Sequence, residues 1–513
     1  MLTPLPTAAK LAAGQLPLTV EGVCHIMFER NDHFLAGRWV PAKGTELIEV
    51  VSPSTEKVVG RVPAALPEEV DTAVAGAREA FERGPWPKLT LAERAEYLRR
   101  LVAELGARRE QVLHLQTEEM GATRRFAEEN FNLFGPFLER MISDADKIPF
   151  HEVRDGTVGK VLVMREPVGV TAAVTPWNSP VMVALSKVYP SLLMGCPIVL
   201  KPAPESPLSA YLIGEAVSAA GIPEGVVSIV NGDASIGAYL VGHPGIDHVT
   251  FTGSTNGGRA IGAACANKLR SVTLELGGKS AAVVLPGVDM TPYLPALVGN
   301  SLRNSGQICI STNRVIVHVD DRDRVVEQLV DYVSTLKVGD PHEADTDFGP
   351  LAAARQRDNV ERFIASGVAE GAKIVLGGGR PPDQPTGWYV EPTIFVDVDS
   401  KMEIAQEEIF GPVLSVITYY DEDEAVAIAN DSKYGLGGAV FAKDPAHGIE
   451  IAAKIVTGTC SVNGGPPSGG GAPFGGRKDS GLGYERDVEG LESFLELKSV
   501  TLPAGYEPHT ATP

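Results

Sequence analysis

Two hydrophobic patterns follow one another along the chain. Residues 33–62 alternate short apolar runs with turn residues, which predicts antiparallel strands. Apolar residues then recur at helical spacing over 67–82 and 90–109, and residues 110–141 are expected to continue as helix. Thr90 begins a capping box, which marks the start of the second helix.

From Val168 onward, short apolar runs alternate with helical stretches, which is typical of a parallel sheet covered on both faces. The expected strands of the first set are 169–175, 197–201, 226–230, 248–252 and 271–276, with helices at 181–194, 206–220, 235–241 and 256–268. After Lys279 a second set begins, with strands at 281–285, 314–318, 374–376, 413–419 and 438–441 and helices near 291–304, 322–336, 354–370, 421–430 and 445–456. The glycine-rich stretch 464–476 is expected to be a loop. The sequence therefore predicts an α/β protein with two sheet domains, the first binding ligands at the carboxyl ends of its strands.

Length and charge narrow the function classes. The chain has 513 residues, more than one ordinary domain needs, so two or three domains are expected. The net charge of −20 argues against a general nucleic-acid or anionic-membrane partner. No run of eighteen apolar residues is present, so no membrane span is expected.

The cysteines and histidines suggest a reducing compartment and no metal. Five cysteines are scattered without a Cys-x-x-Cys pair, which disfavours a disulfide framework or a zinc cluster and favours a cytoplasmic location. The ten histidines show no His-Glu-x-x-His spacing. Residues 1–20 resemble a loose arm rather than a signal peptide, and residues 505–513 a loose tail.

Cys309 is the first candidate for chemistry. It follows Asn304-Ser305-Gly306-Gln307, a polar lead-in that suits a turn exposing the thiol to backbone N–H groups, which would lower its pKa. The alternative is an inert, buried cysteine that serves as a small hydrophobe.

Glu275 is the second candidate. It lies at the end of the expected strand 271–276, where a buried carboxylate is costly unless it is paired or functional. The following glycines, Gly277 and Gly278, permit close approach by a ligand or another backbone. The alternative is a structural ion pair.

Three further segments suit a nucleotide or an oxyanion. Lys201 ends a buried strand and can reach a ribose or phosphate, or can simply extend to solvent. The turn 251–258 can present N–H groups to a pyrophosphate, or can be an ordinary strand-to-helix turn. Asn178 can donate to a developing oxyanion, or can serve turn chemistry. No Gly-x-Gly-x-x-Gly follows any expected strand, so the standard dinucleotide fingerprint is absent.

Taken together, these segments resemble the aldehyde dehydrogenase superfamily over about residues 33–503. Seven motifs occur in the family's order: Thr175-Pro176-Trp177-Asn178, Lys201-Pro202-Ala203, Phe251-Thr252-Gly253-Ser254, Glu275-Leu276-Gly277-Gly278-Lys279, Gly306-Gln307-Ile308-Cys309, Glu408-Ile409-Phe410-Gly411-Pro412 and Pro473-Phe474-Gly475-Gly476. Each motif alone is weak, whereas seven in order are specific.

The resemblance implies a mechanism and a cofactor site. Cys309 would attack the aldehyde to form a thiohemiacetal and then a thioester, Asn178 would stabilise the oxyanion, and Glu275 would activate the hydrolytic water. The cofactor would be NAD, with NADP possible. The residues implied to bind it are Thr175, Pro176, Trp177, Lys201, Gly253, Ser254, Gly258, Leu276, Glu408 and Phe410.

The chain departs from the family pattern at three positions. Members that prefer NAD often carry a glutamate three residues after the lysine, whereas this chain has Pro204 there and Glu205 one position later. Ser179 and Arg303 replace aromatic residues of the substrate tunnel, and Phe474 keeps an apolar wall. Arg303 either favours a substrate with a remote anionic group or turns to solvent.

The resemblance also implies three structural parts and an oligomer. A Rossmann-like cofactor-binding domain would comprise 1–148 and 168–278, and a catalytic domain 279–489. A small β extension, 149–167 and 490–513, would pair between subunits of a homodimer or homotetramer, because exposed strand edges favour pairing.

Other functions remain open at this point. A CoA-acylating semialdehyde dehydrogenase usually lacks the glutamate base, so Glu275 argues against it. The nucleotide motifs argue against a cysteine esterase, and intact Cys309, Glu275 and Asn178 argue against a binding protein without activity. The sequence does not identify the aldehyde.

Overall fold

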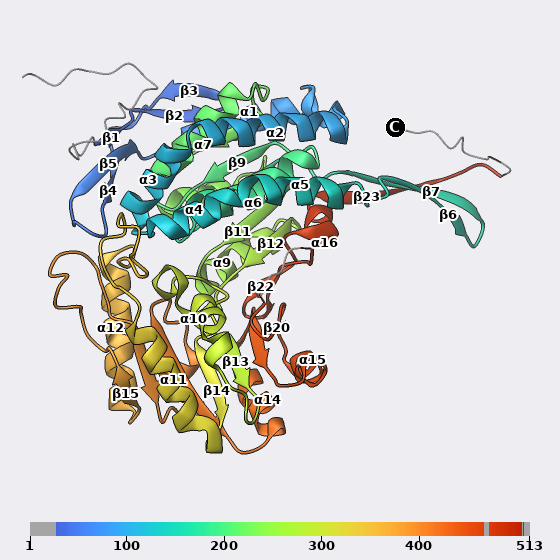
Figure 1. Ribbon diagram of the computed structural model, residues 1–513. Coiled ribbons are helices and arrows are strands. Elements are labelled where there is room, and N and C mark those ends of the chain that lie inside the picture. The colour runs from blue at the N-terminus through green and yellow to red at the C-terminus, as the bar shows by residue number, and fades with distance from the viewer. Residues whose placement is uncertain (1–26, 466–470, 505, 507–513) are drawn as a thin grey trace, which may run out of the picture.

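The computed structural model describes residues 27–465, 471–504 and 506. The expected N-terminal arm, the expected tail apart from Tyr506, and residues 466–470 of the glycine-rich loop lie outside the described residues. Two large sheets, one above the other in Figure 1, carry most of the chain, and a three-stranded extension projects from the side.

The first large sheet has eight strands in the order β22-β12-β11-β8-β9-β10-β2-β3. The five central strands are parallel, and antiparallel partners close both edges. The strands are β2 (Asp32–Leu35), β3 (Arg38–Pro41), β8 (Thr171–Val174), β9 (Ile198–Lys201), β10 (Val227–Ile229), β11 (His248–Thr252), β12 (Ser271–Glu275) and β22 (Gly481–Leu482). The expected parallel sheet is confirmed, because the central strands are short apolar runs buried on both faces.

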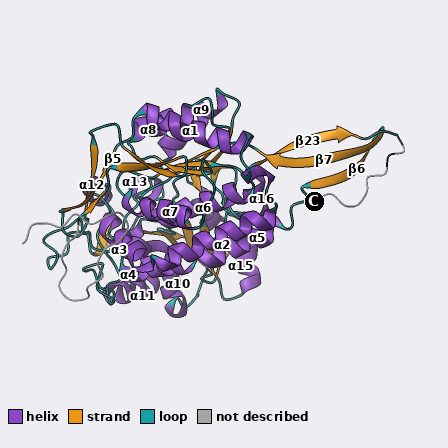
Figure 2. Cartoon of the chain, turned by 90° about the horizontal axis from the view of Figure 1, so that it is seen from above, coloured by secondary structure: helices purple, strands orange, loops and turns teal. Residues whose placement is uncertain are grey.

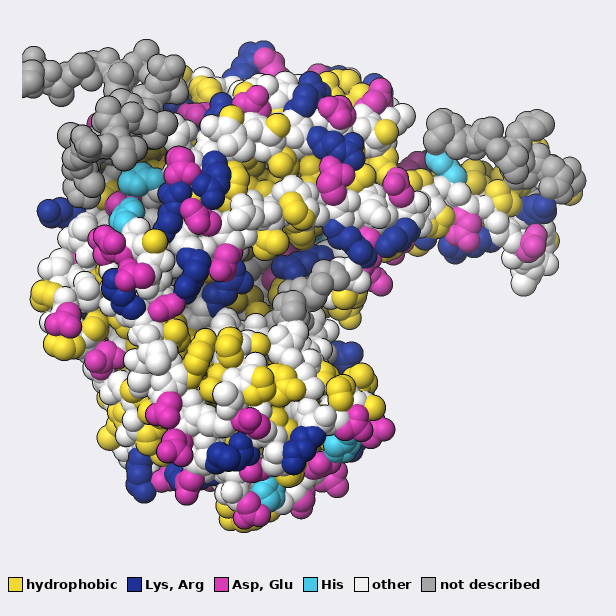
Figure 3. Space-filling view, viewed as in Figure 1, with side chains coloured by type: hydrophobic (Ala, Val, Ile, Leu, Met, Phe, Trp, Pro, Cys, Tyr) yellow, Lys and Arg dark blue, Asp and Glu magenta, His cyan; other side chains and the backbone are white. Residues whose placement is uncertain are grey.

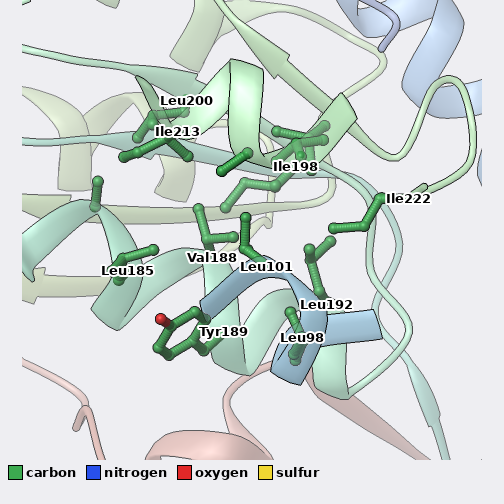
Figure 4. Packing of buried hydrophobic residues seen from close by; sticks show 14 of the residues in the cluster. Leu98, Leu101, Leu185, Val188, Tyr189, Leu192, Ile198, Leu200, Ile213 and Ile222 are labelled. Atoms are coloured by element: carbon green, nitrogen blue, oxygen red, sulfur yellow. The ribbon is translucent and has the colours of Figure 1, made fainter. Parts of the chain in front are cut away.

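Helices cover both faces of this sheet (Figure 2). One face carries α1 (Pro67–Glu82), α8 (Ala234–Gly242) and α9 (Thr255–Ala266). The other carries α6 (Pro180–Leu193) and α7 (Leu208–Ala219), with α2 (Leu91–Ala107) and α5 (Phe134–Ala145) packed outside them. Figure 4 shows this core, where Leu98 and Leu101 of α2 meet Leu185, Val188 and Leu192 of α6.

The helical prediction for 110–141 is confirmed except for its continuity, because the region forms three helices rather than one. These are α3 (Arg109–Met120), α4 (Arg124–Asn132) and α5. Gly121 adopts a left-handed φ of 73° and ends α3, and the Thr123 hydroxyl accepts a hydrogen bond from Phe126 N and caps α4. By contrast, the predicted capping box at Thr90 is present.

The second large sheet has seven strands in the order β15-β16-β17-β14-β13-β19-β20. All its pairs are parallel except β15–β16. The strands are β13 (Ala281–Val284), β14 (Arg314–His318), β15 (Lys373–Leu376), β16 (Thr393–Val396), β17 (Val413–Tyr419), β19 (Gly438–Phe441) and β20 (Ser461–Val462). Its helices are α10 (Leu294–Leu302), α11 (Arg322–Ser334), α12 (Ala354–Ala369), α13 (Glu403–Gln406), α14 (Glu422–Asn430) and α15 (Pro445–Lys454).

Three small sheets complete the fold. The projecting extension is antiparallel and consists of β6 (His151–Gly156), β7 (Gly159–Pro167) and β23 (Leu495–Thr501), and α16 (Asp487–Glu492) precedes β23. The others are β1 (Phe28–Glu29), β4 (Leu47–Val51) and β5 (Val58–Pro63), and the pair β18 (Tyr434–Gly435) and β21 (Arg477–Lys478). Single 3₁₀ turns lie at Trp86–Lys88, Thr291–Tyr293, Arg303–Gly306 and Val319–Asp321.

The antiparallel strands expected at 33–62 form two separate pairs. The pair β2–β3 joins the edge of the first large sheet, whereas β4–β5 belongs to a small sheet in which β1 runs parallel to β5. The described helices include none long and apolar enough to cross a membrane.

Candidate active site

Four strands of the first sheet end at one edge and bring the candidate polar residues together. Parallel pairing sets Val174 opposite Lys201 and Thr252 opposite Glu275. Thr175 N donates to Lys201 O at 3.1 Å, and Gly253 N donates to Glu275 O at 3.0 Å. The segments carrying Asn178, Lys201, Ser254 and Glu275 therefore leave the sheet side by side, as parallel strands require.

The Cys309 thiol is carried by a strained turn after α10, where the helix predicted for 291–304 ends early. Asn304 and Ser305 have φ of 53° and 55°, and Gly306 has φ of 75°. A left-handed backbone is costly for residues with a side chain, and such strain persists only where the surroundings fix it. The Ser305 hydroxyl donates to Gly349 O at 2.7 Å, and Ala352 N donates to Gln307 Oε1 at 3.0 Å.

Asn178 joins this turn to the first sheet. Its side-chain Nδ2 donates to Gln307 O at 2.8 Å, and Asn304 Nδ2 donates back to Asn178 O at 3.0 Å. Asn178 is buried, so these bonds lie away from solvent and are not weakened by competition with water. The structure thus brings Asn178 and the Cys309 turn together, as their expected roles require.

The glycine pair after Glu275 lets three segments meet. A Cβ on Gly278 would lie 2.3 Å from Cys309 O, and one on Gly277 would lie 2.4 Å from Glu408 Oε2. Gly278 N also donates to Glu408 Oε1 at 2.9 Å. The close approach expected at these glycines is therefore to the cysteine backbone on one side and to the Glu408 carboxylate on the other.

Glu275 has an unusual environment for a carboxylate. It is 2 % exposed, and neither of its carboxylate oxygens has a hydrogen-bond partner within the described part of the chain. Burial and the neighbouring Glu485 carboxylate raise the pKa of Glu275 well above its usual value, while Lys187 and Arg486 oppose this rise. Glu485 itself pairs with the Lys187 ammonium. Glu275 therefore does not form the structural ion pair that was its alternative role. The ion pair at this place joins Glu485 and Lys187.

The Cys309 thiol is protonated in this arrangement. Burial, followed by the Glu275 and Glu408 carboxylates, raises the pKa of Cys309 to about 12. The expectation that the turn's backbone N–H groups lower this pKa was wrong, because desolvation and two nearby carboxylates outweigh them. Cys309 keeps some exposed surface.

The residues expected to hold a cofactor line the same edge of the sheet. Burial lowers the pKa of Lys201 to about 8, and its Nζ donates to Pro202 O. Ser254 caps α9 by accepting a hydrogen bond from Gly257 N at 3.2 Å. The Trp177 and Phe410 rings meet edge to face at 5.4 Å between centroids. Burial also raises the pKa of Glu408 to about 7.

The other residues expected to bind the cofactor lie around the ends of β8 and β12. They are Thr175, Pro176, Gly258 and Leu276. A Cβ on Gly258 would lie 2.3 Å from Leu276 Cδ2, so this glycine lets α9 pack against the end of β12. Thr175 is buried, and its hydroxyl has no hydrogen-bond partner among the described residues. Pro176 and Trp177 follow it in the turn between β8 and α6.

The three expected tunnel residues lie in different settings. Ser179 is buried at the start of α6. Phe474 is buried, exchanges two 2.7 Å backbone bonds with Glu485, and has the Arg486 guanidinium 4.6 Å from its ring centre. Arg303 is half exposed, pairs with Glu129 at 2.7 Å and stacks over Phe126. Its guanidinium therefore already has protein partners at a half-exposed position.

Sequence reasoning missed Lys187, Glu485, Arg486 and Gln307. Lys187 carried a signal, because it is a lone charge in the otherwise apolar helix α6. Glu485 lies 298 residues from Lys187, and no local pattern links them. Gln307 was noted only as part of the cysteine motif, although its side chain holds the turn at both ends.

Solved structures with this arrangement of sheets and extension are aldehyde dehydrogenases. The Mycobacterium tuberculosis aldehyde dehydrogenase complexed with NAD+ is 43% identical, with a TM-score of 0.90 over 94% of this chain and 100% of that one. A variant of aldehyde dehydrogenase C from Pseudomonas syringae, complexed with NAD+ and octanal, is 38% identical, with a TM-score of 0.88 over 93% and 98%.

The family model described as "Aldehyde dehydrogenase family" matches residues 39–500, and the chain belongs to this family of oxidoreductases. The geranial dehydrogenase of Castellaniella defragrans is 44% identical over 471 residues, which cover 91% of this chain and 98% of that protein.

The contact at Gly278 predicts the effect of a single methyl group. Gly278→Ala would press Cβ against Cys309 O and displace the cysteine turn, so the rate of aldehyde oxidation should fall by about two orders of magnitude or more. Gly135→Ala in α5, where the nearest atom would be 3.7 Å away, is the matched control and should keep wild-type activity. Initial rates and circular dichroism of both variants test this. A folded Gly278→Ala enzyme with wild-type rate would refute the proposed contact.

Proposed function

We propose that this protein oxidises an aldehyde to a carboxylic acid with NAD+, using Cys309 as the covalent nucleophile and Glu275 as the base that activates water. The observation that carries the proposal is the buried Glu275 carboxylate, which has no hydrogen-bond partner among the described residues and raises the pKa of Cys309. A buried, unpartnered carboxylate is costly to the fold, and such groups gather at functional sites.

The proposed steps conserve atoms and charge. The Cys309 sulfur bonds to the aldehyde carbon while the thiol proton passes to water, which gives a thiohemiacetal oxyanion. Asn178 uses one amide hydrogen on Gln307 O, and its second can donate to this oxyanion. Loss of hydride from the carbon leaves a thioester, and Glu275 then takes a proton from the water that attacks it, which releases the acid and the thiol.

The residues at the sheet edge fit a nicotinamide dinucleotide. The unpartnered Thr175 hydroxyl and the buried Lys201 amine are polar groups for which a ligand would supply partners. Lys201 and Glu205 would hold the adenosine ribose, Gly253 and Ser254 the pyrophosphate, and Glu408 the nicotinamide ribose. The bound cofactor supplies the hydride acceptor.

NAD+ is the proposed cofactor, with NADP+ as the alternative. Two of the similar solved structures are NAD+ complexes. The glutamate that is missing at Pro204 would be replaced by Glu205, one position later. The Glu205 carboxylate lies close enough to Lys201 to raise the pKa of this lysine, whereas burial lowers it. Glu205 also forms an ion pair with Arg355. A cofactor ribose that binds Glu205 would therefore share this carboxylate with Arg355 or displace Arg355 from it.

An apolar aldehyde is the proposed substrate class. The relatives named above act on geranial or bind octanal, both of which are hydrophobic aldehydes. Phe474 would supply an apolar wall and Ser179 a less bulky one, whereas Arg303 is neutralised by Glu129 and would not select an anionic substrate.

The larger organisation is also proposed. The cofactor-binding domain would comprise 1–148 and 168–278, the catalytic domain 279–489, and the oligomerisation extension 149–167 and 490–513. The exposed β6–β7–β23 sheet would pair with another subunit in a dimer or tetramer. The scattered cysteines support a cytoplasmic location.

Replacing Glu275 should separate the two half-reactions. In Glu275→Gln, the first turnover should still produce reduced cofactor, but the thioester should accumulate because no base activates water. Mass spectrometry of the quenched enzyme should show Cys309 carrying the acyl group, and steady-state turnover should fall by about 10²–10⁴. Rapid thioester hydrolysis in this variant would contradict the role of Glu275. Release of the acyl group only when CoA is added would favour the CoA-acylating alternative.

The raised pKa of Glu275 predicts how hydrolysis depends on pH. Glu275 accepts a proton only when ionised, so hydrolysis should accelerate as pH rises above the ordinary carboxyl value of 4.5, and Glu275→Gln should lose this dependence. Because the folded state binds this proton more tightly than the unfolded state, ionising Glu275 costs stability as pH rises. Glu275→Gln should therefore melt at a higher temperature than wild type at pH 8, with a smaller difference at pH 5. The same pH profile in variant and wild type would contradict this assignment.

A further inference from the structure

Two histidines and a glutamate form a cluster outside the proposed active site. His114 and Glu118 lie on α3, and His342 comes from the segment between α11 and α12. One ligand atom from each lies within 4.8 Å of the other two, and His342 Nε2 is 2.8 Å from Glu118 Oε1. Figure 3 shows histidine side chains at the surface, on the side of the molecule where Figure 1 labels α3.

Glu118 is the buried centre of this cluster. It is 5 % exposed, and its second carboxylate oxygen, Oε2, has no hydrogen-bond partner within the described residues. The pairing with His342 uses Oε1, and the Ser52 hydroxyl lies near this carboxylate without forming a hydrogen bond of standard geometry to Oε2, which is costly in a buried position. A cation held by both Glu118 and the histidines would remove this cost.

The backbone places the three residues next to one another before any ion binds. His114 and Glu118 are four residues apart on α3 and therefore share one face of the helix. The His342 turn is fixed because His342 N donates to Asp340 Oδ1 at 2.9 Å and Arg124 N donates to Pro341 O at 2.8 Å. Ligand atoms of a tetrahedral zinc site lie about 3.3 Å apart, so small side-chain rotations would complete the geometry.

The local charges favour a cation. The charged neighbours of His342 are the Glu118 and Asp340 carboxylates and the Arg124 guanidinium, two negative groups against one positive group. Both histidines also have exposed surface, which leaves room for water at a fourth position.

We propose that His114, Glu118 and His342 form a binding site for a divalent transition metal of the zinc class. Two imidazoles with one carboxylate suit zinc and its neighbours, whereas magnesium and calcium prefer oxygen ligands. The spacing of histidines in the sequence gives no sign of this site, because His342 lies 224 residues from Glu118.

The site would join two parts of the chain that meet beside the active site. The segment after His342 contains Gly349 and Ala352, which accept from Ser305 and donate to Gln307 of the cysteine turn. A metal that ties α3 to this segment would therefore stabilise the support of the Cys309 turn, and binding to the folded state alone would raise the melting temperature.

The test is zinc titration of untagged, metal-stripped protein carrying Cys309→Ala, since a tag or the active-site thiol would bind zinc as well. Calorimetry should find one equivalent of Zn²⁺ per chain, and scanning fluorimetry a rise in melting temperature that saturates at that ratio. His114→Asn and His342→Asn should each weaken binding by at least about tenfold. Co²⁺ in place of Zn²⁺ should give visible bands without a sulfur charge-transfer band.

A matched control is His447→Asn. The His447 side chain is 40 % exposed, against 39 % for His342, and it too pairs with a glutamate, Glu422. This variant should bind zinc like the parent. Equal zinc affinity in the parent and in both cluster variants, or no bound equivalent in the parent, would overturn the proposal, and a cooperative metal-free melting transition in each variant would show that it is folded.

Discussion

The close approach of Gly278 to the carbonyl oxygen of Cys309 is the constraint on which the site depends. It brings the end of strand β12, which carries Glu275, against the turn that carries the thiol. The turn reaches this position only through three successive left-handed residues, which its hydrogen bonds to Gly349 and Ala352 hold in place. The end of a strand of the first large sheet and a turn in the second domain therefore meet at one candidate site.

The electrostatics of that centre follow from burial rather than from ion pairing. Glu275 lies among Lys187, Glu485 and Arg486, and desolvation together with Glu485 keeps its proton bound well above the usual pH. The same carboxylate and Glu408 raise the pKa of the Cys309 thiol. Burial disfavours the ionised form of this carboxylate and so makes it a stronger base. A strong base suits the proposed removal of a proton from water.

Local sequence patterns predicted much of this architecture. The parallel strands were predictable because they are short, doubly buried apolar runs. The catalytic roles of Cys309, Glu275 and Asn178, inferred from the family order of their motifs, stay predictions. The helix break at Gly121 and the strand β16 were missed, because a single glycine and a four-residue run give weak local signals. The pKa of Cys309 was mispredicted, since it depends on Glu275 and Glu408, which lie close only in the folded chain. The Lys187–Glu485 pair and the His114–Glu118–His342 cluster are likewise contacts between distant segments.

The most direct test of the account is the formation of reduced cofactor, followed by absorbance, with wild type and Cys309→Ser side by side. Octanal and geranial should be compared with a charged and a short aldehyde, each with NAD+ and NADP+. The account predicts reduction that requires Cys309, is fastest with the apolar aldehydes and prefers NAD+. Cofactor reduction of equal rate in the Cys309→Ser enzyme would contradict covalent catalysis by this thiol.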